Sequence, residues 1–160
     1  MTIEAGDTIP DVALYTYGAD GPEGIATGDI FKDKKVVVFG LPGAFTPTCS
    51  AKHLPGYIAN AEAIKAKGID SIVCISVNDA FVMGAWGKEQ NAGGAGTLIA
   101  DGSGEFARAT GLELDLTGKG LGVRCQRFSM VVDDGVVESL DIDEGGSFDK
   151  TSAEKMLEKL

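Results

Sequence analysis

Two short apolar runs with a helical stretch between them place the strongest limit on the fold of this chain. The runs are KVVVFGL at residues 35–41 and SIVCISV at residues 71–77. Continuous apolar runs of this length, rich in β-branched residues, are typical of strands covered on both faces. Apolar or small residues recur between them at helical spacing: Leu54, Ile58, Ala61 and Ile64. Because Gly68 then stands where a helix C-terminus favours glycine, the pattern predicts a strand, a helix over residues 50–67 and a second strand.

The rest of the chain continues this alternation of strands and helices. The further predicted elements are a helix through residues 81–90 with Asn78 and Asp79 as N-caps, a strand over 97–100, a short helix within 101–110, a hairpin of strands 127–132 and 136–140, and an amphipathic helix over 147–160. The hairpin prediction depends on Asp133-Asp134-Gly135, because Asp-Gly between apolar runs is a strong turn signal. A glycine-rich turn over residues 18–24 predicts another hairpin near the N-terminus.

A parallel βαβ core followed by an antiparallel hairpin and a helix is the element order of thioredoxin-like α/β proteins. We therefore expect one domain over residues 1–160, with a central mixed sheet flanked by helices. The N-terminal hairpin and the segment near residues 97–125 are expected to be additions to this core. A chain of 160 residues is long enough to bury its own core without a metal or disulfides.

Charge and cysteine content exclude several classes of function. The formal net charge is −10, so the chain repels phosphate backbones and anionic lipid. No apolar run approaches the ~18 residues of a membrane span, and the N-terminus has no basic start or apolar core. We therefore expect no nucleic-acid, membrane or secretory role. The three cysteines are an odd number, which disfavours a disulfide framework and favours a reducing, cytoplasmic location.

The loop PGAFTPTCS, at residues 42–50, holds the most informative cysteine. Because this loop lies between the first predicted core strand and the long helix, Cys49 falls at the start of that helix. There, unpaired backbone N–H groups and the positive end of the helix dipole favour the thiolate, which is the nucleophilic form. Pro42 and Pro47 restrict the loop backbone, and a turn can bring the hydroxyl of Thr46 beside the sulfur. Taken by themselves, these residues also fit a plain loop with a buried cysteine.

The combination of Pro42, Thr46 and Cys49 resembles the signature of the peroxiredoxins. The longer text PGAFTPTCS…HLPGY resembles the type II, or peroxiredoxin-5-like, branch of that family. Further stretches resemble the same branch: SVNDAFV from residue 76, WG from residue 86 and RFSMVV from residue 127. The resemblance covers nearly the whole chain. It implies a homodimeric, thiol-dependent peroxidase of antioxidant defence and redox homeostasis, which acts on hydrogen peroxide and small alkyl hydroperoxides and needs no cofactor.

The resemblance also implies roles for individual residues. It makes Cys49 the peroxidatic cysteine, places Thr46 and Pro42 beside it, and makes Arg127 the catalytic arginine of the family. A guanidinium stays charged and offers fixed donors, so it can favour the thiolate and polarise a peroxide O–O bond. From the residues alone, Arg127 also fits a surface arginine at a strand end, since Arg124 is close by and equally basic.

The other two cysteines receive no role from their spacing alone. Cys74 lies in an apolar strand and fits a small core residue. In the plant-like members that the chain resembles, the corresponding strand carries a resolving cysteine, so Cys74 is also a candidate for that role. In that case the helix start must unwind, because Cα atoms more than ~7 Å apart cannot be bridged. Otherwise glutathione, a glutaredoxin or a thioredoxin reduces Cys49 directly. Cys125 is expected to be a partly exposed bystander thiol.

His53 is the only histidine and lies one helical turn after Cys49. A Cys-His pair is compatible with a hydrolase, but no third group is suggested that would orient the imidazole. The cysteines and His53 lack the spacing of metal ligands. We therefore expect no metal, and we expect His53 to be a structural or electrostatic neighbour. The alternative function is a redox sensor or chaperone-like protein on the same fold, whereas a thioredoxin-type reductase would require a Cys-x-x-Cys pair.

Overall fold

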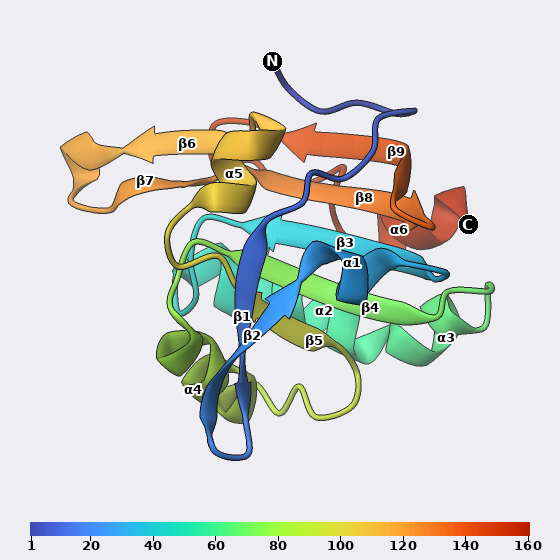
Figure 1. Ribbon diagram of the computed structural model, residues 1–160, viewed down its shortest axis with the longest axis horizontal. Coiled ribbons are helices and arrows are strands. Elements are labelled where there is room, and N and C mark those ends of the chain that lie inside the picture. The colour runs from blue at the N-terminus through green and yellow to red at the C-terminus, as the bar shows by residue number, and fades with distance from the viewer.

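A seven-stranded sheet forms the centre of the molecule, and helices cover both of its faces (Figure 1). The computed structural model describes residues 1–160. Its strands are β1 (Ala13–Gly18), β2 (Gly21–Ala26), β3 (Lys35–Leu41), β4 (Ser71–Ser76), β5 (Thr97–Ala100), β6 (Glu113–Leu116), β7 (Gly122–Cys125), β8 (Arg127–Asp133) and β9 (Val136–Asp143). Its helices are α1 (Thr27–Phe31), α2 (Leu54–Ala59), α3 (Ala61–Lys65), α4 (Ala80–Glu89), α5 (Glu105–Thr110) and α6 (Ala153–Lys159), with a π-helical turn η1 (Cys49–His53) and a 3-10 turn η2 (Thr117–Lys119). None of the helices combines the length and the apolar character that a membrane crossing requires.

The strand order is β2-β1-β5-β4-β3-β8-β9, with β6 and β7 paired separately. Strands β3, β4 and β5 run parallel, whereas the β1–β2 and β8–β9 hairpins pair antiparallel, so the sheet is mixed. The β8–β9 hairpin turns at Asp134 and Gly135, whose φ angles are 47° and 80°. Two-residue hairpin turns of type I′ require positive φ at both central residues, which explains the Asp-Gly signal. The predicted thioredoxin-like α/β fold is confirmed.

Alternate residues of β3 pack into two separate cores. Val37, Phe39 and Leu41 face the core that lies under α2, α3, α4 and α6. Val36 and Val38 face the other core, which lies under α1 and α5. Because both faces of β3 are buried, its sequence is continuously apolar, as expected for a central strand of a sheet covered on both sides.

Several predicted boundaries differ from the structure. The predicted helix over residues 50–67 is divided into η1, α2 and α3, and Asn60, at φ −103° and ψ 9°, interrupts it between α2 and α3. The last helix begins at Ala153 rather than near residue 147, because the Ser152 hydroxyl accepts a hydrogen bond from Lys155 N and caps it. Strand β5 lies inside the central sheet, between β1 and β4, so the expectation that it is an addition to the core is wrong.

Candidate active site

The predicted site residues meet at the carboxyl end of β3. This strand ends at Leu41, and the loop that follows it leads to Cys49. In the antiparallel pair of β3 and β8, Gly40 lies opposite Phe128. Arg127 therefore lies level with the end of β3, where the loop begins. The sheet register therefore brings Arg127 and the loop that carries Cys49, which are distant in sequence, to the same edge of the sheet.

Cys49 is fully buried, and its sulfur contacts a guanidinium. It opens the π-helical turn η1, in which Leu54 N donates to Cys49 O. Such turns are frequent at functional sites. Nη2 of Arg127 donates a hydrogen bond to Sγ of Cys49 at 3.3 Å. The Arg127 residue is only 7% exposed, so a fixed positive charge and a nucleophilic atom share one buried space. A guanidinium that donates to sulfur complements a negative charge on that sulfur.

Thr46 and Pro42 belong to the loop that leads to Cys49, as predicted. The Thr46 hydroxyl donates to Gly43 O at 2.6 Å, and no hydrogen bond joins it to the Cys49 sulfur. Its hydrogen is thus used within the loop, while its oxygen can still accept. Phe45 has a φ angle of 64°, a left-handed conformation that is uncommon for a bulky residue. Residues held in such conformations are found most often at functional sites.

Two residues that the sequence did not assign to the site hold this loop in place. Asn78 Oδ1 accepts a hydrogen bond from Ala44 N at 2.9 Å. Asn78 is therefore not a helix cap, and Asp79 alone caps α4. Arg124 Nη1 donates to Pro42 O at 3.3 Å, from strand β7. No local sequence pattern could have found these contacts, because each joins segments that are far apart in the chain.

The two ring nitrogens of His53 make different contacts. Nε2 lies 3.2 Å from Thr151 O, and because a carbonyl oxygen only accepts, Nε2 carries the proton. Nδ1 is then an acceptor, and Arg127 Nη1 donates to it at 2.8 Å. Burial and then the charge of Arg127 lower the pKa of His53 to about 3. The ring is therefore neutral near pH 7. This geometry agrees with the expectation that His53 is a neighbour of the site.

Cys74 and Cys125 are buried free thiols that lie in different cores. Cys74 shares the core of Cys49, and burial raises its pKa well above the ordinary value. Burial also raises the pKa of Cys125 to about 12, and its thiol donates to Leu41 O at 3.1 Å. The expectation that Cys125 is partly exposed is wrong, since it is 1% exposed. Strand β7 carries it beneath the carboxyl end of β3, a placement that no local pattern reports.

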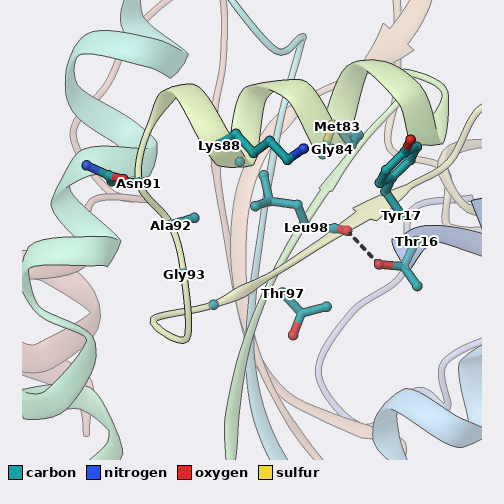
Figure 2. Close-up of a pocket in the computed structure, with 12 residues that line it drawn as sticks. Thr16, Tyr17, Met83, Gly84, Lys88, Asn91, Ala92, Gly93, Thr97 and Leu98 are labelled. Atoms are coloured by element: carbon teal, nitrogen blue, oxygen red, sulfur yellow. Dashed lines mark hydrogen bonds between the residues drawn. The ribbon is translucent and has the colours of Figure 1, made fainter. Parts of the chain in front are cut away.

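A groove of about 540 Å³ lies away from Cys49, between β1, α4 and β5 (Figure 2). Tyr17 and Lys88 line it, and Thr16 Oγ1 donates to Leu98 O at 3.4 Å. None of the site residues predicted from the sequence lines this groove, so it is separate from the thiol site. No group of three or more His, Cys, Asp or Glu side chains is placed to hold a metal ion.

Comparison with known proteins agrees with this geometry. The chain matches the Redoxin family over residues 4–157. It is 49% identical over 164 residues to chloroplastic peroxiredoxin-2E-2 of Oryza sativa subsp. japonica, covering 99% of this chain and 73% of that protein. It is 46% identical to peroxiredoxin-2D of Arabidopsis thaliana, covering 99% and 98%. The crystal structure of reduced Prx3 from Vibrio vulnificus in complex with hydrogen peroxide aligns with a TM-score of 0.93 at 46% identity, over 99% of both chains.

Relatives of this identity over the full chain, together with the fold, define a class of protein: an oxidoreductase that reduces peroxides with a thiol on a thioredoxin scaffold. The chain belongs to the peroxiredoxin family, in its type II branch. This confirms the family and the thiol-dependent peroxidase activity that were predicted from the loop at residues 42–50 and from the stretches after residues 76 and 127.

The same relatives contradict the expected cytoplasmic location. The rice protein is named chloroplastic, and so is peroxiredoxin-2E of Arabidopsis thaliana, which is 47% identical over 163 residues and covers 99% of this chain and 70% of that protein. The expectation depended on the odd number of cysteines. A count of thiols reports whether disulfides hold a fold together, and it does not distinguish one reducing compartment from another.

Proposed function

We propose that Cys49 is the peroxidatic residue of this peroxidase. In the proposed step, the Cys49 thiolate attacks one oxygen of the peroxide, an S–O bond forms and the O–O bond breaks. The sulfur is oxidised to a sulfenic acid and the peroxide is reduced by the same two electrons. The departing oxygen takes up a proton and leaves as water or an alcohol. The hydrogen bond of 3.3 Å from Arg127 Nη2 to Cys49 Sγ is the observation that supports this assignment most directly.

Three further residues are proposed to assist Cys49. Arg127 would act as a catalytic residue, because its fixed, charged donors can follow the negative charge as it moves from the sulfur to the departing oxygen. Thr46 would orient the peroxide by accepting a hydrogen bond from its O–H, since the Thr46 hydrogen is already donated to Gly43 O. Pro42 would keep the loop in shape, because its ring restricts φ and it has no N–H donor.

The proposed substrates are hydrogen peroxide and small alkyl hydroperoxides. They are small and uncharged, which suits a buried sulfur atom in a chain with a net charge of −10. The Vibrio vulnificus relative was crystallised in complex with hydrogen peroxide. We further propose that residues 1–160 act as one peroxiredoxin domain and that the protein serves antioxidant defence and redox homeostasis.

Regeneration of Cys49 requires a second thiol. The sulfenic acid condenses with that thiol to form a disulfide and water. Two reducing thiols then break this disulfide by successive exchange and leave as a disulfide of their own. The position of Cys74 in the core of Cys49 supports it as the second thiol. Because Cys74 is buried in β4, Cys49 must leave η1 before the two can join. In the alternative route, glutathione, a glutaredoxin or a thioredoxin attacks the Cys49 sulfur directly.

The proposed homodimer is supported by exposed aromatic side chains. Phe45, in the loop before Cys49, is 52% exposed, and Phe81, at the start of α4, is 62% exposed. The rings of Tyr17 and Phe81 lie 6.0 Å apart between centroids. Large exposed aromatic residues of this kind are enriched at protein interfaces. Sedimentation equilibrium tests the proposal: a monomer at micromolar concentration would contradict it.

The role of Cys49 is tested by peroxide consumption with a thioredoxin or glutaredoxin system. Cys49→Ser should lose turnover completely, whereas Cys125→Ser, a matched buried cysteine variant, should retain it. Turnover that survives in Cys49→Ser would refute the assignment. The second-order rate of Cys49 with peroxide decides between the peroxidase and a sensor or chaperone-like protein, because a rate no faster than that of free cysteine favours the latter.

The route of regeneration is tested by mass spectrometry after one equivalent of peroxide. A disulfide between Cys49 and Cys74 in the wild type, absent from Cys74→Ser, supports the internal route. A sulfenic acid or a mixed disulfide on Cys49, with no internal disulfide, supports the external route. Turnover of both proteins with glutathione, glutaredoxin and thioredoxin then identifies the reductant.

A further inference from the structure

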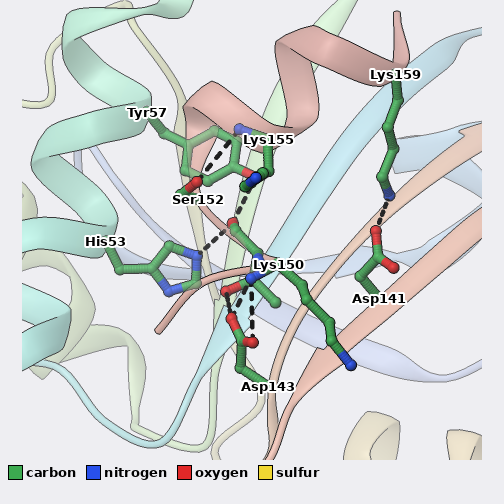
Figure 3. Close-up of polar contacts among 9 residues, drawn as sticks. His53, Tyr57, Asp141, Asp143, Lys150, Ser152, Lys155 and Lys159 are labelled. Carbon is green, nitrogen blue, oxygen red and sulfur yellow. Dashed lines mark hydrogen bonds and ion pairs between the residues drawn. The ribbon is translucent and has the colours of Figure 1, made fainter. Parts of the chain in front are cut away.

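The segment between β9 and α6 closes over Arg127, and a single carboxylate holds that segment. Asp143 ends β9 and lies opposite Arg127 in the β8–β9 register. Its carboxylate accepts hydrogen bonds from the backbone N–H groups of Asp149, Lys150 and Thr151, at 2.9, 3.1 and 3.0 Å, and from Thr151 Oγ1 at 2.8 Å. Figure 3 shows the carboxylate pointing into this turn.

These hydrogen bonds take the place of water around a buried charge. Asp143 is 4% exposed and forms no ion pair. Burial by itself raises the pKa of a carboxyl group, but the hydrogen bonds from residues 149–151 outweigh it and hold the pKa of Asp143 below its ordinary value. Charge-assisted hydrogen bonds are about twice as strong as neutral ones. The shape of the turn at residues 149–151 therefore depends on the single carboxylate of Asp143.

The turn presents the carbonyl group of Thr151 to the interior. Thr151 is fully buried, and its oxygen accepts hydrogen bonds from Tyr57 OH at 2.9 Å and from His53 Nε2 at 3.2 Å. The second contact keeps the proton on Nε2 and leaves a lone pair on Nδ1. Arg127 donates to this lone pair through Nη1 at 2.8 Å, while its Nη2 contacts the sulfur of Cys49.

A second contact ties the same segment to the arginine. Phe148 lies in this segment, with the guanidinium carbon of Arg127 5.7 Å from the centroid of its ring. The same ring lies 5.2 Å from that of His53. A displacement of the segment would therefore disturb the guanidinium through Phe148 as well as through His53.

We propose that Asp143 is a positioning residue of the peroxidatic centre, because it shapes the turn whose Thr151 carbonyl sets the tautomer of His53, which in turn orients Arg127 toward Cys49. This inference rests on the proposed function and extends it to the last strand of the sheet. Without the Thr151 carbonyl, the proton of His53 can move to Nδ1. There it would face an N–H group of Arg127, and the two donors would repel each other.

A purely structural role for Asp143 makes a different prediction. If the carboxylate only holds the approach to α6, its loss lowers stability and leaves the reaction of Cys49 unchanged. If it acts through His53 and Arg127, its loss changes both the rate with peroxide and the pH dependence of Cys49 alkylation. These two measurements report on the sulfur and its charged partner rather than on global folding.

The first experiment compares Asp143→Asn with Asp141→Asn as a matched control. Both variants remove one charge from β9. Asp141 is paired with Lys159 of α6, so its replacement also loosens that helix, but no hydrogen bond or ion pair joins Asp141 to His53, Arg127 or Thr151. Asp143→Asn places an amide NH₂ among N–H donors. We expect its rate with peroxide to fall about ten- to hundredfold. We also expect half-alkylation of Cys49 by iodoacetamide to move to higher pH, and both values to stay unchanged in Asp141→Asn.

The second experiment replaces His53 with two amides of different length. In His53→Asn the amide oxygen takes the place of Nδ1 and can accept from Arg127. In His53→Gln the amide reaches the place of Nε2 and can bind only Thr151. We expect His53→Gln to lose about as much activity as Asp143→Asn, and His53→Asn to lose less. Because His53→Asn already cuts the path from the turn to Arg127 through His53, adding Asp143→Asn to it should cause a smaller loss than Asp143→Asn causes in the wild type, where the paths through His53 and Phe148 are both intact.

The outcomes separate the two levels of the proposal. Wild-type rates and alkylation profiles in Asp143→Asn, or equal losses in the two His53 variants, overturn the role of Asp143. If Asp143→Asn does not fold, the comparison of His53→Asn with His53→Gln still tests the proposal. Turnover that survives Cys49→Ser overturns the proposed function instead, so the two failures are distinguishable.

Discussion

Cys49 and Cys125 are both buried near the carboxyl end of β3, yet their sulfur atoms have opposite partners. Arg127 donates a hydrogen bond to the sulfur of Cys49, whereas the thiol of Cys125 donates to the carbonyl oxygen of Leu41. A charged donor favours the thiolate, and a neutral acceptor favours the thiol. Burial therefore does not by itself decide the chemistry of a cysteine in this fold. The group that faces the sulfur decides it.

The largest expected effect comes from removal of the donor to Cys49. Arg127→Gln keeps a polar side chain but loses the charge, and we expect the second-order rate with peroxide to fall about 10²–10³-fold, as for other preorganised donors. Stopped-flow mixing with hydrogen peroxide measures this rate. Arg124→Gln is the matched control, because Arg124 contacts the loop backbone and not the sulfur. A loss in Arg124→Gln as large as that in Arg127→Gln would contradict the comparison.

Acid should lower the stability of the folded protein through His53, the buried histidine beside the Cys49 site. The pKa of His53 is lowered by burial and by Arg127 to about 3 in the fold, against 6.5 for an ordinary histidine. As the pH falls below 6.5 the unfolded chain binds the proton first, so stability is lost progressively between pH 6.5 and 3. The free energy of unfolding changes by about 1.4 kcal/mol per pH unit in this range. The titration of His53 should therefore lower it by roughly 2–3 kcal/mol at pH 4.5 relative to pH 7.

Urea unfolding of the wild type and His53→Asn at pH 7 and pH 4.5 measures this contribution. The variant should lose less stability on acidification than the wild type. If both lose the same amount, His53 does not carry the acid sensitivity.

Alkali should also lower the stability of the folded protein, through Cys125 and by a smaller amount. Burial raises the pKa of Cys125 to about 12 from an ordinary value of 9.0. Above pH 9 the unfolded chain loses this proton while the folded chain keeps it. The contribution of Cys125 to folding stability is therefore complete below pH 9 and is lost as the pH rises toward 12. The expected loss at pH 10 is about 1 kcal/mol relative to pH 8. Unfolding of Cys125→Ser at the same two pH values should show a weaker dependence, whereas an unchanged dependence would exclude Cys125 as its source.

The smallest expected effect is that of Cys125→Ser on activity. The serine hydroxyl can still donate to Leu41 O, and the substitution should cost about 1 kcal/mol of stability, as is common for buried positions. The rate with peroxide should stay unchanged, because Cys125 does not contact Cys49 or Arg127 through any hydrogen bond. A tenfold loss of rate would show that the two thiols are coupled.

The fold was largely predictable because its signals are local. The apolar run of β3, the Asp-Gly turn of the β8–β9 hairpin and the position of Cys49 at a helix start each depend on neighbouring residues. The errors occurred where a distant segment decides. Asn78 binds Ala44 rather than capping α4. The break at Asn60 is a local exception, because the Asn60 side chain donates to Gly56 O within the same helix turn.

The candidate site divides in the same way. The motif residues Pro42, Thr46 and Cys49 are close in sequence, so one loop identifies them. Arg127 became a site residue only through resemblance, because from its own neighbours it is no different from Arg124. Asp143 had no signal in the sequence, since its partners are the backbone groups of a turn whose path only the folded chain defines.

The sequence by itself determined the order of strands and helices, the family and the nucleophilic loop, because periodicity, turn residues and a long motif are properties of adjacent residues. Only the tertiary structure decided which sulfur faces a guanidinium and which faces a carbonyl group. That choice depends on the register of β3 against β8 and on the path of β7, which place Arg127 beside Cys49 and Cys125 beneath Leu41. Hydrogen bonds to sulfur are contacts over a few ångströms, and the sheet rather than the local sequence sets them.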